Sequence, residues 1–190
     1  MTVVTQKWKE EENDLILRSR QGERSAFAEL ICRHQRGVIN VVYRMCGDAQ
    51  LAEDAAQEAF IRAWRGLSGY RPTGDFRSWL YRIALNAGLD MLRRQKRETE
   101  ADMENMADCN TPEALLVRKE SADRVRAAVL TLSEASRAVL ILREYEGLSY
   151  QEIAAALDIP TGTVMSRLNY ARTCLRTLLG AARGVEVDHA

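Results

Sequence analysis

The stretch "LSYQEIAAALDIPTGTVMSRLNYAR", residues 148–172, predicts two short helices joined by a tight turn. Ser149 and Glu152 have the spacing of a capping box, so the first helix should begin directly after Ser149. Pro160 cannot donate the hydrogen bond that a continuing helix requires, so a second helix should follow it, with Thr161 as its cap. The pattern is typical of a helix-turn-helix, whose second helix lies in the DNA major groove.

The second of these helices carries the side chains that would meet DNA. Val164, Leu168 and Leu175 should face inward. The residues that then point mainly outward are Ser166, Arg167, Asn169, Tyr170 and Arg172. Residues 161–183 contain four arginines and no acid, which suits a surface that meets phosphates. The alternative is a helical hairpin packed into its own domain, with the arginines as a solvated face.

The whole chain has the composition of a helical globular protein. Of its 190 residues, 46% are hydrophobic and 28% are charged. Only 3 are proline, and apolar residues recur mostly at helical spacing, so we expect an all-α fold. No stretch approaches the roughly 20 apolar residues of a membrane span, and the N-terminus lacks the apolar core of a signal peptide. We therefore expect a cytoplasmic protein.

The net charge is zero, but the charges are segregated along the chain. From Phe76 to Arg97 there are six basic residues and one acid, a balance of +5. Residues 98–113 hold six acids and no basic residue, a balance of −6. We predict two small helical domains, residues 10–97 and 113–182, joined by a flexible acidic linker of residues 98–112.

Four helices are expected in the first domain. One should cover about residues 13–21, and the next should start with Ser25 as its N-cap and end before Gly47. A third should cover about residues 49–65. After a loop rich in turn formers, Asp75 can cap the fourth.

Three segments together carry a family resemblance. They are "LAEDAAQEAFIRAWRGL" from Leu51, "DFRSWLYRIALNAGLDMLRRQKR" from Asp75 and "LREYEGLSYQEIAAALDIPTGTVMSRLNYAR" from Leu142. In this combination the chain resembles the bacterial extracytoplasmic-function (ECF) sigma factors, promoter-specificity subunits of RNA polymerase, from about Asp14 to Leu179. The resemblance implies that the first domain binds core polymerase and opens the −10 element, while the second binds the −35 element as duplex.

The polymerase contact is expected on the helix that contains "AEDAAQEAF". Asp54, Gln57 and Glu58 lie at spacings of three and four and can share one helix face. From charge alone this is a solvated polar face; the resemblance implies that it docks on the clamp helices of the largest polymerase subunit. The polymerase-binding residues are then Asp54, Gln57, Glu58 and Arg62. Phe60 and Trp64 should pack in the core.

The −10 contacts are expected on the basic helix and the loop before it. By resemblance they are Tyr70, Arg71, Arg82, Ile83, Asn86, Asp90, Arg93 and Arg94. Tyr70 would receive a flipped-out base, and such stacking contributes roughly 1–3 kcal/mol per base. Trp79 should be packed, whereas Tyr81 stays undecided. Gly88 is unexpected inside this helix, where it costs about 1 kcal/mol relative to alanine.

The −35 contacts that the resemblance implies are Thr161, Thr163, Ser166, Arg167, Tyr170 and Arg172. A bidentate arginine–guanine pair is worth about 1–3 kcal/mol of discrimination. The sequence departs from the family at Met165 and Tyr170, where a basic residue is frequent. A −35 consensus therefore cannot be transferred from the family.

The resemblance also implies the partners. They are core RNA polymerase, with its clamp helices on the first domain and its flap on the second, and promoter DNA, duplex at −35 and single-stranded at −10. An anti-sigma factor, membrane-anchored or soluble, should control a free sigma factor that is monomeric and does not insert into membranes. The acidic linker either runs toward the RNA exit path or serves only for spacing and solubility.

Two other classes of protein are alternatives to a sigma factor. A stand-alone helix-turn-helix regulator would bind duplex operator DNA, usually as a dimer, but no sustained heptad pattern predicts a dimer helix. An enzyme would need a reactive group, yet Cys32 and His34 are two residues apart and do not face each other on a helix. We expect no catalytic activity, no metal and no cofactor. Thiol sensing through Cys32 and Cys46 is left open.

Overall fold

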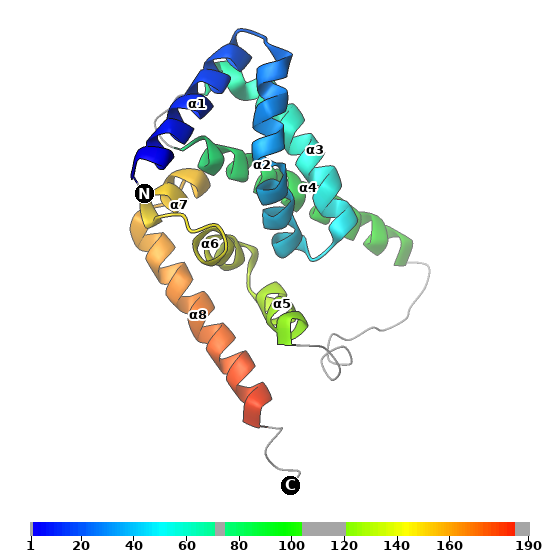
Figure 1. Cartoon of the computed structure of the whole chain (residues 1–190). Helices are drawn as coiled ribbons and strands as arrows, with labels where there is room; N and C mark the ends of the chain where they lie inside the picture. Colours follow the sequence, from blue (N-terminus) through cyan, green and yellow to red (C-terminus); the bar gives the residue numbers. More distant parts are fainter. Residues whose placement is uncertain (1, 71–74, 104–120, 185–190) are drawn as a thin grey trace.

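The computed structural model describes residues 2–70, 75–103 and 121–184, and the side chains of 7–70, 75–97 and 123–180. These residues form eight α-helices and one 3-10 turn, without a strand, so the all-α prediction is confirmed. The elements are α1 (Thr2–Arg20), α2 (Arg24–Cys46), α3 (Ala49–Gly66), η1 (Leu67–Gly69), α4 (Phe76–Met103), α5 (Ser121–Thr131), α6 (Glu134–Glu144), α7 (Tyr150–Leu157) and α8 (Thr161–Gly184) (Figure 1). Arg71 and most of the predicted linker lie outside the described residues.

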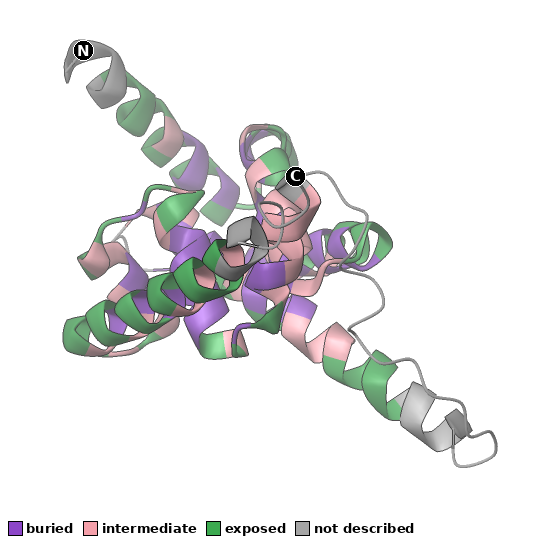
Figure 2. Ribbon diagram, turned by 90° about the horizontal axis from the view of Figure 1, so that it is seen from below, coloured by how far each residue is buried: buried purple, intermediate pink, exposed green. Residues whose placement is uncertain are grey.

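Helices α1 to α4 form a first unit around a shared core. Helices α2, α3 and α4 pack against one another, and α1 lies along α2 (Figure 1). Helix α3 turns a row of small residues inward, all of them buried: Ala52, Ala55, Ala56, Ala59 and Ala63. Small side chains let helix axes approach closely, and larger residues such as Val42 and Leu80 fill the remaining space. Buried residues accordingly gather in the middle of the molecule (Figure 2).

Gly88 is explained by the same close packing. A Cβ atom at this position of α4 would lie 2.7 Å from Val42 Cγ1 and 3.4 Å from Cys46 Sγ, both in α2. Gly37 has the corresponding role on α2, since a Cβ there would lie 2.5 Å from the hydroxyl of Tyr81. The glycine that costs helix propensity therefore allows α2 and α4 to touch.

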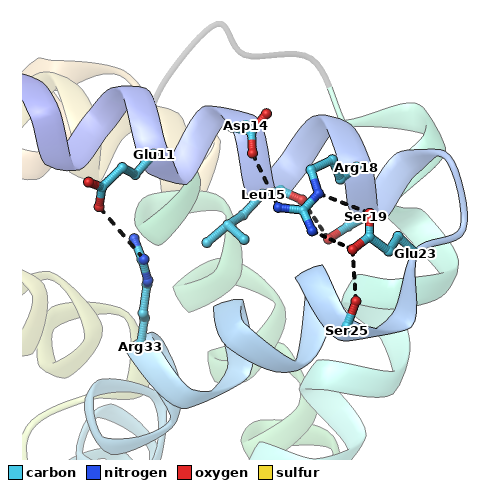
Figure 3. A network of polar contacts seen from close by, with 8 residues as sticks. All are labelled: Glu11, Asp14, Leu15, Arg18, Ser19, Glu23, Ser25 and Arg33. Atoms are coloured by element: carbon cyan, nitrogen blue, oxygen red, sulfur yellow. Dashed lines mark hydrogen bonds and ion pairs between the residues drawn. The ribbon is translucent and has the colours of Figure 1, made fainter.

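Polar contacts fix α1 on α2 (Figure 3). Arg18 donates to Asp14 at 3.4 Å and to Glu23 at 2.9 Å, and Ser25 donates to Glu23 at 2.8 Å. The pKa of Glu23 is lowered to about 2, mainly by the hydrogen bond from Arg18. Helix α2 begins at Arg24, so Ser25 lies inside its first turn and does not cap it.

Helices α5 to α8 form a second unit, with α7 and α8 as the predicted helix-turn-helix. The capping box is confirmed: Ser149 N donates to Glu152 Oε2 at 2.7 Å, and Glu152 N donates to Ser149 Oγ at 3.2 Å. Helix α7 ends at Leu157, and its C-cap Asp158 has φ 54° and ψ 50°. This left-handed residue and Pro160 turn the chain into α8, whose Val164 and Leu168 are buried.

The two units share one continuous core and are joined by two arginines, of which Arg137 is buried and Arg126 half-buried. Arg137 of α6 donates to the carbonyl of Met45, near the end of α2, at 2.6 Å, and to the carbonyl of Leu132 at 2.7 Å. Arg126 of α5 donates to the Tyr43 hydroxyl of α2. Figure 1 shows α5 and α6 beside the end of α2 and α7 beside α4.

Several predicted helix ends were wrong. Helix α1 begins at Thr2, because contacts with α2 hold its polar first half: Trp8 stacks on Arg33 at 5.1 Å, and Glu12 lies 2.7 Å from His34 Nε2. The N-cap of α2 is Glu23, and Thr161 is the first residue of α8, not its cap. Helix α4 continues to Met103, because the acidic segment contains good helix formers and no glycine or proline there.

Within the described residues, no helix combines the length and apolar character needed to cross a membrane.

Candidate nucleic-acid interface

Helix α8 presents an uncharged centre with arginines at its edges. Thr161, Ser166 and Tyr170 are exposed, whereas Thr163 and Arg167 are half-buried. The hydroxyl of Ser166 donates to the Thr163 carbonyl at 3.0 Å. The structure thus turns every predicted −35 residue at least partly toward solvent.

Arg172 is held by a carboxylate of the same unit. Its Nη2 and Nε donate to Glu144 Oε1 at 2.6 and 3.0 Å. The pKa of Arg172 is raised, mainly by its hydrogen bond to Glu144. Arg172 is therefore positioned at one edge of the exposed face, close to α6.

The predicted −10 side chains lie along α4 as expected from their spacing. Arg82, Asn86, Arg93 and Arg94 are exposed, and Ile83 and Asp90 are half-buried. Two of these arginines meet carboxylates of the second unit: Arg93 donates to Glu134 at 2.7 Å, and Arg82 lies 3.7 Å from Asp158. Both arginines thus form ion pairs between the two units in this arrangement.

Tyr70 is buried in this structure rather than open for stacking. It is 6% exposed, with its ring 4.9 Å from Trp79 and 5.6 Å from Phe76, measured between centroids. Burial raises the pKa of its hydroxyl to about 12. A flipped-out base can stack on Tyr70 only if Tyr70 leaves these aromatic neighbours.

Tyr81, which the sequence left undecided, belongs to the boundary between the units. It is 3% exposed, and its hydroxyl donates to Glu146 of the second unit at 2.6 Å. Neither the burial of Tyr81 nor its partner could be predicted, because Glu146 lies 65 residues further along the chain. Trp79 is half-buried and packed against the core, as predicted.

The predicted polymerase-binding residues share the outer face of α3. Asp54 and Gln57 are exposed, and Glu58 and Arg62 are half-buried. Arg62 donates to Glu58 at 2.7 Å and across to Asp90 of α4 at 3.1 Å. The hydrogen bond to Glu58, followed by that to Asp90, raises the pKa of Arg62. One ion network thus joins the predicted polymerase face to the predicted −10 helix.

A hollow of about 260 Å³ lies between the start of α3 and residues 91–95 of α4. Its lining is Asp48, Gln50, Leu51, Asp54, Met91, Arg94 and Gln95. It therefore brings Asp54 near Arg94, two residues that the sequence assigned to different partners. Among the described residues, no group of three His, Cys, Asp or Glu side chains could hold a metal.

The fold and these faces define a two-unit helical protein of the helix-turn-helix class. Family models of Sigma-70 region 2 and Sigma-70, region 4 match residues 30–98 and 122–175. The chain is 35% identical to RNA polymerase sigma-H factor of Pseudomonas aeruginosa, over 87% of this chain and 92% of that protein. It is 34% identical to ECF RNA polymerase sigma factor SigW of Bacillus subtilis, over 86% and 94%.

A solved structure agrees with this comparison. CnrH, in complex with the cytosolic domain of CnrY, shares 27% identity with a TM-score of 0.70, over 90% of this chain and 98% of that chain. The chain belongs to the sigma-70 family, in its ECF group of RNA polymerase sigma factors.

Proposed function

We propose that this sigma factor binds core RNA polymerase through α3, reads and opens the −10 element with α4 and reads the −35 element with α8. The observation that carries the proposal is the order of two family regions on one chain, each with its own exposed polar helix. The division suits the chemistry, since α8 is the second helix of a helix-turn-helix and α4 bears exposed arginines that can bind the DNA backbone.

The basic side of α4 supports a contact with the DNA backbone. Arg82, Arg93 and Arg94 are exposed on it, with Asn86 between them. Positive charge binds phosphates without regard to sequence, whereas an exposed amide can hydrogen-bond a base edge. Asn86 is therefore proposed as the −10 selectivity residue, with the arginines as its phosphate anchors.

The outer face of α3 supports the contact with polymerase. Asp54 and Gln57 are exposed outside the core, and Asp54 accepts one exposed hydrogen bond, from Gln50 of the same helix at 3.3 Å, so both side chains are accessible to a partner. Acidic and amide side chains suit a basic helical surface, and the clamp helices are proposed as that surface. The proposed flap contact belongs to the second unit.

Control by an anti-sigma factor is part of the proposal. CnrH, which resembles this chain over most of its length, was solved with the cytosolic domain of CnrY. In the present structure Arg82 and Arg93 already meet carboxylates of the second unit. A protein that held the two units in this arrangement would keep both arginines from promoter DNA. The proposed site of action is the cytoplasm, where polymerase and promoters meet.

The test is in vitro transcription with sigma-free bacterial core polymerase on a pool of genomic fragments. RNA 5′ ends that depend on the protein and share spaced −35 and −10 elements would support the proposal. Duplex binding without polymerase, and without protein-dependent starts, would favour a stand-alone regulator. Asp54→Ala is expected to weaken core binding without lowering the melting temperature, because the residue is exposed; Glu53→Ala, exposed on the same helix, is the matched control.

A further inference from the structure

We infer that Asn169 is a base-reading residue of α8 that specifies adenine in the −35 element, with Met165 beside it contacting a thymine methyl group. The inference rests on the proposed function, since it names what the second unit reads. Asn169 is absent from the −35 contacts that the family resemblance implies, and Met165 departs from the family pattern.

The position of Asn169 follows from the phase of the helix. The buried side of α8 is formed by Val164, Leu168 and Ala171, each at most 1% exposed. The opposite side is formed by residues at spacings of four, three and four: Gly162, Ser166, Asn169 and Thr173. We call this exposed row the reading stripe. It carries no charge, so its contacts to DNA are hydrogen bonds or apolar contacts and not salt bridges to phosphates.

The length of the reading stripe matches a short stretch of bases. Asn169 lies seven positions after Gly162, which corresponds to about 10 Å at a rise of 1.5 Å per residue. DNA bases are about 3.4 Å apart along one strand, so these two residues lie about three bases apart. Asn169 lies in the third turn of α8, within the N-terminal half that recognition helices direct at bases.

Among the four residues of the stripe, Asn169 has the side chain that can distinguish one base, whereas the hydroxyl of Thr173 can bond to several bases. Gly162 has no side chain, and the hydroxyl of Ser166 is donated to its own helix. Among the described residues, the Asn169 amide has no hydrogen-bond partner. An amide offers a donor and an acceptor side by side, which is the pattern that adenine N7 and N6 require in the major groove.

Two arginines of α8, Arg167 and Arg172, lie to the sides of the stripe, where they suit phosphates rather than bases. Arg167 is half-buried on one side, while Arg172 lies on the other and is fixed by Glu144 at 2.6 Å. Phosphate contacts at both sides set the register of a helix in the groove, and base contacts supply the sequence. The guanidinium groups therefore place Asn169 over the bases.

Met165, on the same part of the helix, adds a preference for thymine. Its side chain is 54% exposed and lies one turn before Asn169, at i−4. An apolar side chain cannot hydrogen-bond guanine, but it can pack on the methyl group of thymine. Met165 and Asn169 together favour A·T pairs where a basic residue would favour guanine.

The experiment uses the full chain with sigma-free core polymerase and a duplex template library randomised over the upstream and −10 elements. Templates that yield transcript are sequenced. The wild type is expected to select adenine at one upstream position, and Asn169→Ala is expected to reduce that preference roughly 5- to 150-fold while other positions keep theirs. Asn169→Arg is expected to shift the same position toward guanine. Met165→Ala should weaken a neighbouring thymine preference.

Asn13→Ala is the matched control, because Asn13 is an exposed helical asparagine in α1, remote from the stripe. It should select the wild-type sequences. An unchanged upstream profile with Asn169→Ala, alongside normal selection by the wild type, would overturn the inference alone. No upstream selection by the wild type would overturn the inference and the proposed function together.

Discussion

The hydroxyl of Tyr81 donates a 2.6 Å hydrogen bond to Glu146 Oε2, and this bond joins the helix proposed to read the −10 element to the loop before the helix-turn-helix. Gly37 makes room for it, because any Cβ there would collide with the Tyr81 hydroxyl. Burial, and then the bond to Glu146, raise the pKa of Tyr81. Three segments far apart in sequence thus meet at one phenol.

Tyr81→Phe is expected to lower the free energy of unfolding by about 1.5–3 kcal/mol at pH 7, since a hydrogen bond to a charged group is lost. The ordinary pKa of tyrosine is about 10. The pKa of Tyr81 is raised in the folded protein. The neutral hydroxyl therefore contributes its full share to the free energy of unfolding below about pH 10, and this share is lost as the pH rises further. Urea unfolding at pH 7, 9 and 11 measures it.

Phenylalanine does not titrate, so the difference between wild type and Tyr81→Phe should narrow at pH 11. A difference that stays constant from pH 7 to 11 would mean that the hydroxyl does not carry the effect.

Arg137→Met is expected to loosen the second unit from the first. Arg137 is 9% exposed and donates to the carbonyls of Met45, Leu130 and Leu132, while burial lowers the pKa of its guanidinium. Leaving buried carbonyls without a donor costs about 1–3 kcal/mol each, so we expect a loss on the order of 3 kcal/mol. All three tryptophans lie in the first unit, so fluorescence follows that unit and far-UV circular dichroism follows both.

In the wild type the two signals should unfold together, and in Arg137→Met they should separate. Arg36→Met, an exposed arginine of α2, is the control and should stay within about 0.5 kcal/mol of wild type. Coincident transitions in Arg137→Met would show that the units are held together by other contacts.

Helix boundaries that depend on contacts within a few residues could be predicted from the sequence. The Ser149–Glu152 capping box and the break at Pro160 act within a few residues, so the sequence placed α7 and α8 correctly apart from the capping of α8. The faces of α3 and α4 also followed from residue spacing, because a helix fixes which side chains are neighbours.

What depended on distant contacts could not be predicted. Arg137 reads as a surface arginine in "EASRAVLIL", and only the end of α2 makes it a buried donor. Tyr70 and Tyr81 look alike in sequence, yet one packs on aromatic rings and the other bonds to Glu146. The first half of α1 has little apolar periodicity, and its helix is held by Arg33 and His34 of another element.

Gly88→Ala is expected to lower the free energy of unfolding by about 1 kcal/mol. Overpacking costs about 1–3 kcal/mol, and the higher helix propensity of alanine offsets up to about 1 kcal/mol of that. The new methyl group would lie 2.7 Å from Val42 Cγ1, and Val42 is fully buried and short, so it cannot swing away. Thermal unfolding measures the change.

Gly180→Ala is the matched control. Gly180 is also helical, but nothing lies within 4 Å of its added Cβ, so alanine there should stabilise by about 0.5–1 kcal/mol. Val42→Ala should make Gly88→Ala less costly. A stabilising Gly88→Ala would contradict the close approach of α2 and α4.

Glu134→Gln is expected to raise affinity for single-stranded DNA by a few fold. The change frees Arg93 of α4 from a carboxylate 2.7 Å away, and exposed ion pairs of this kind are worth about 0–1 kcal/mol. Fluorescence polarisation of a labelled oligonucleotide at low salt measures it, and higher salt should reduce the difference.

Any lost carboxylate makes the chain more basic, so the control must remove the same charge elsewhere. Glu29→Gln does this, since Glu29 pairs with Arg33, away from α4. Equal gains from Glu134→Gln and Glu29→Gln would assign the effect to net charge instead of to the released arginine.

Arg167→Ala and Asn86→Ala should separate the two reading helices. Arg167 lies on α8 and Asn86 on α4, so Arg167→Ala should weaken binding of −35 duplex, while Asn86→Ala should leave it unchanged and relax −10 selectivity. Loss of one phosphate or base contact corresponds to about 1–3 kcal/mol. Duplex affinity is measured by polarisation and −10 selectivity by transcription from templates altered at single −10 positions. Asn86 is exposed and its loss should not unfold α4, so an equal effect of both changes on −35 duplex binding would mean that the helices do not divide the promoter between them.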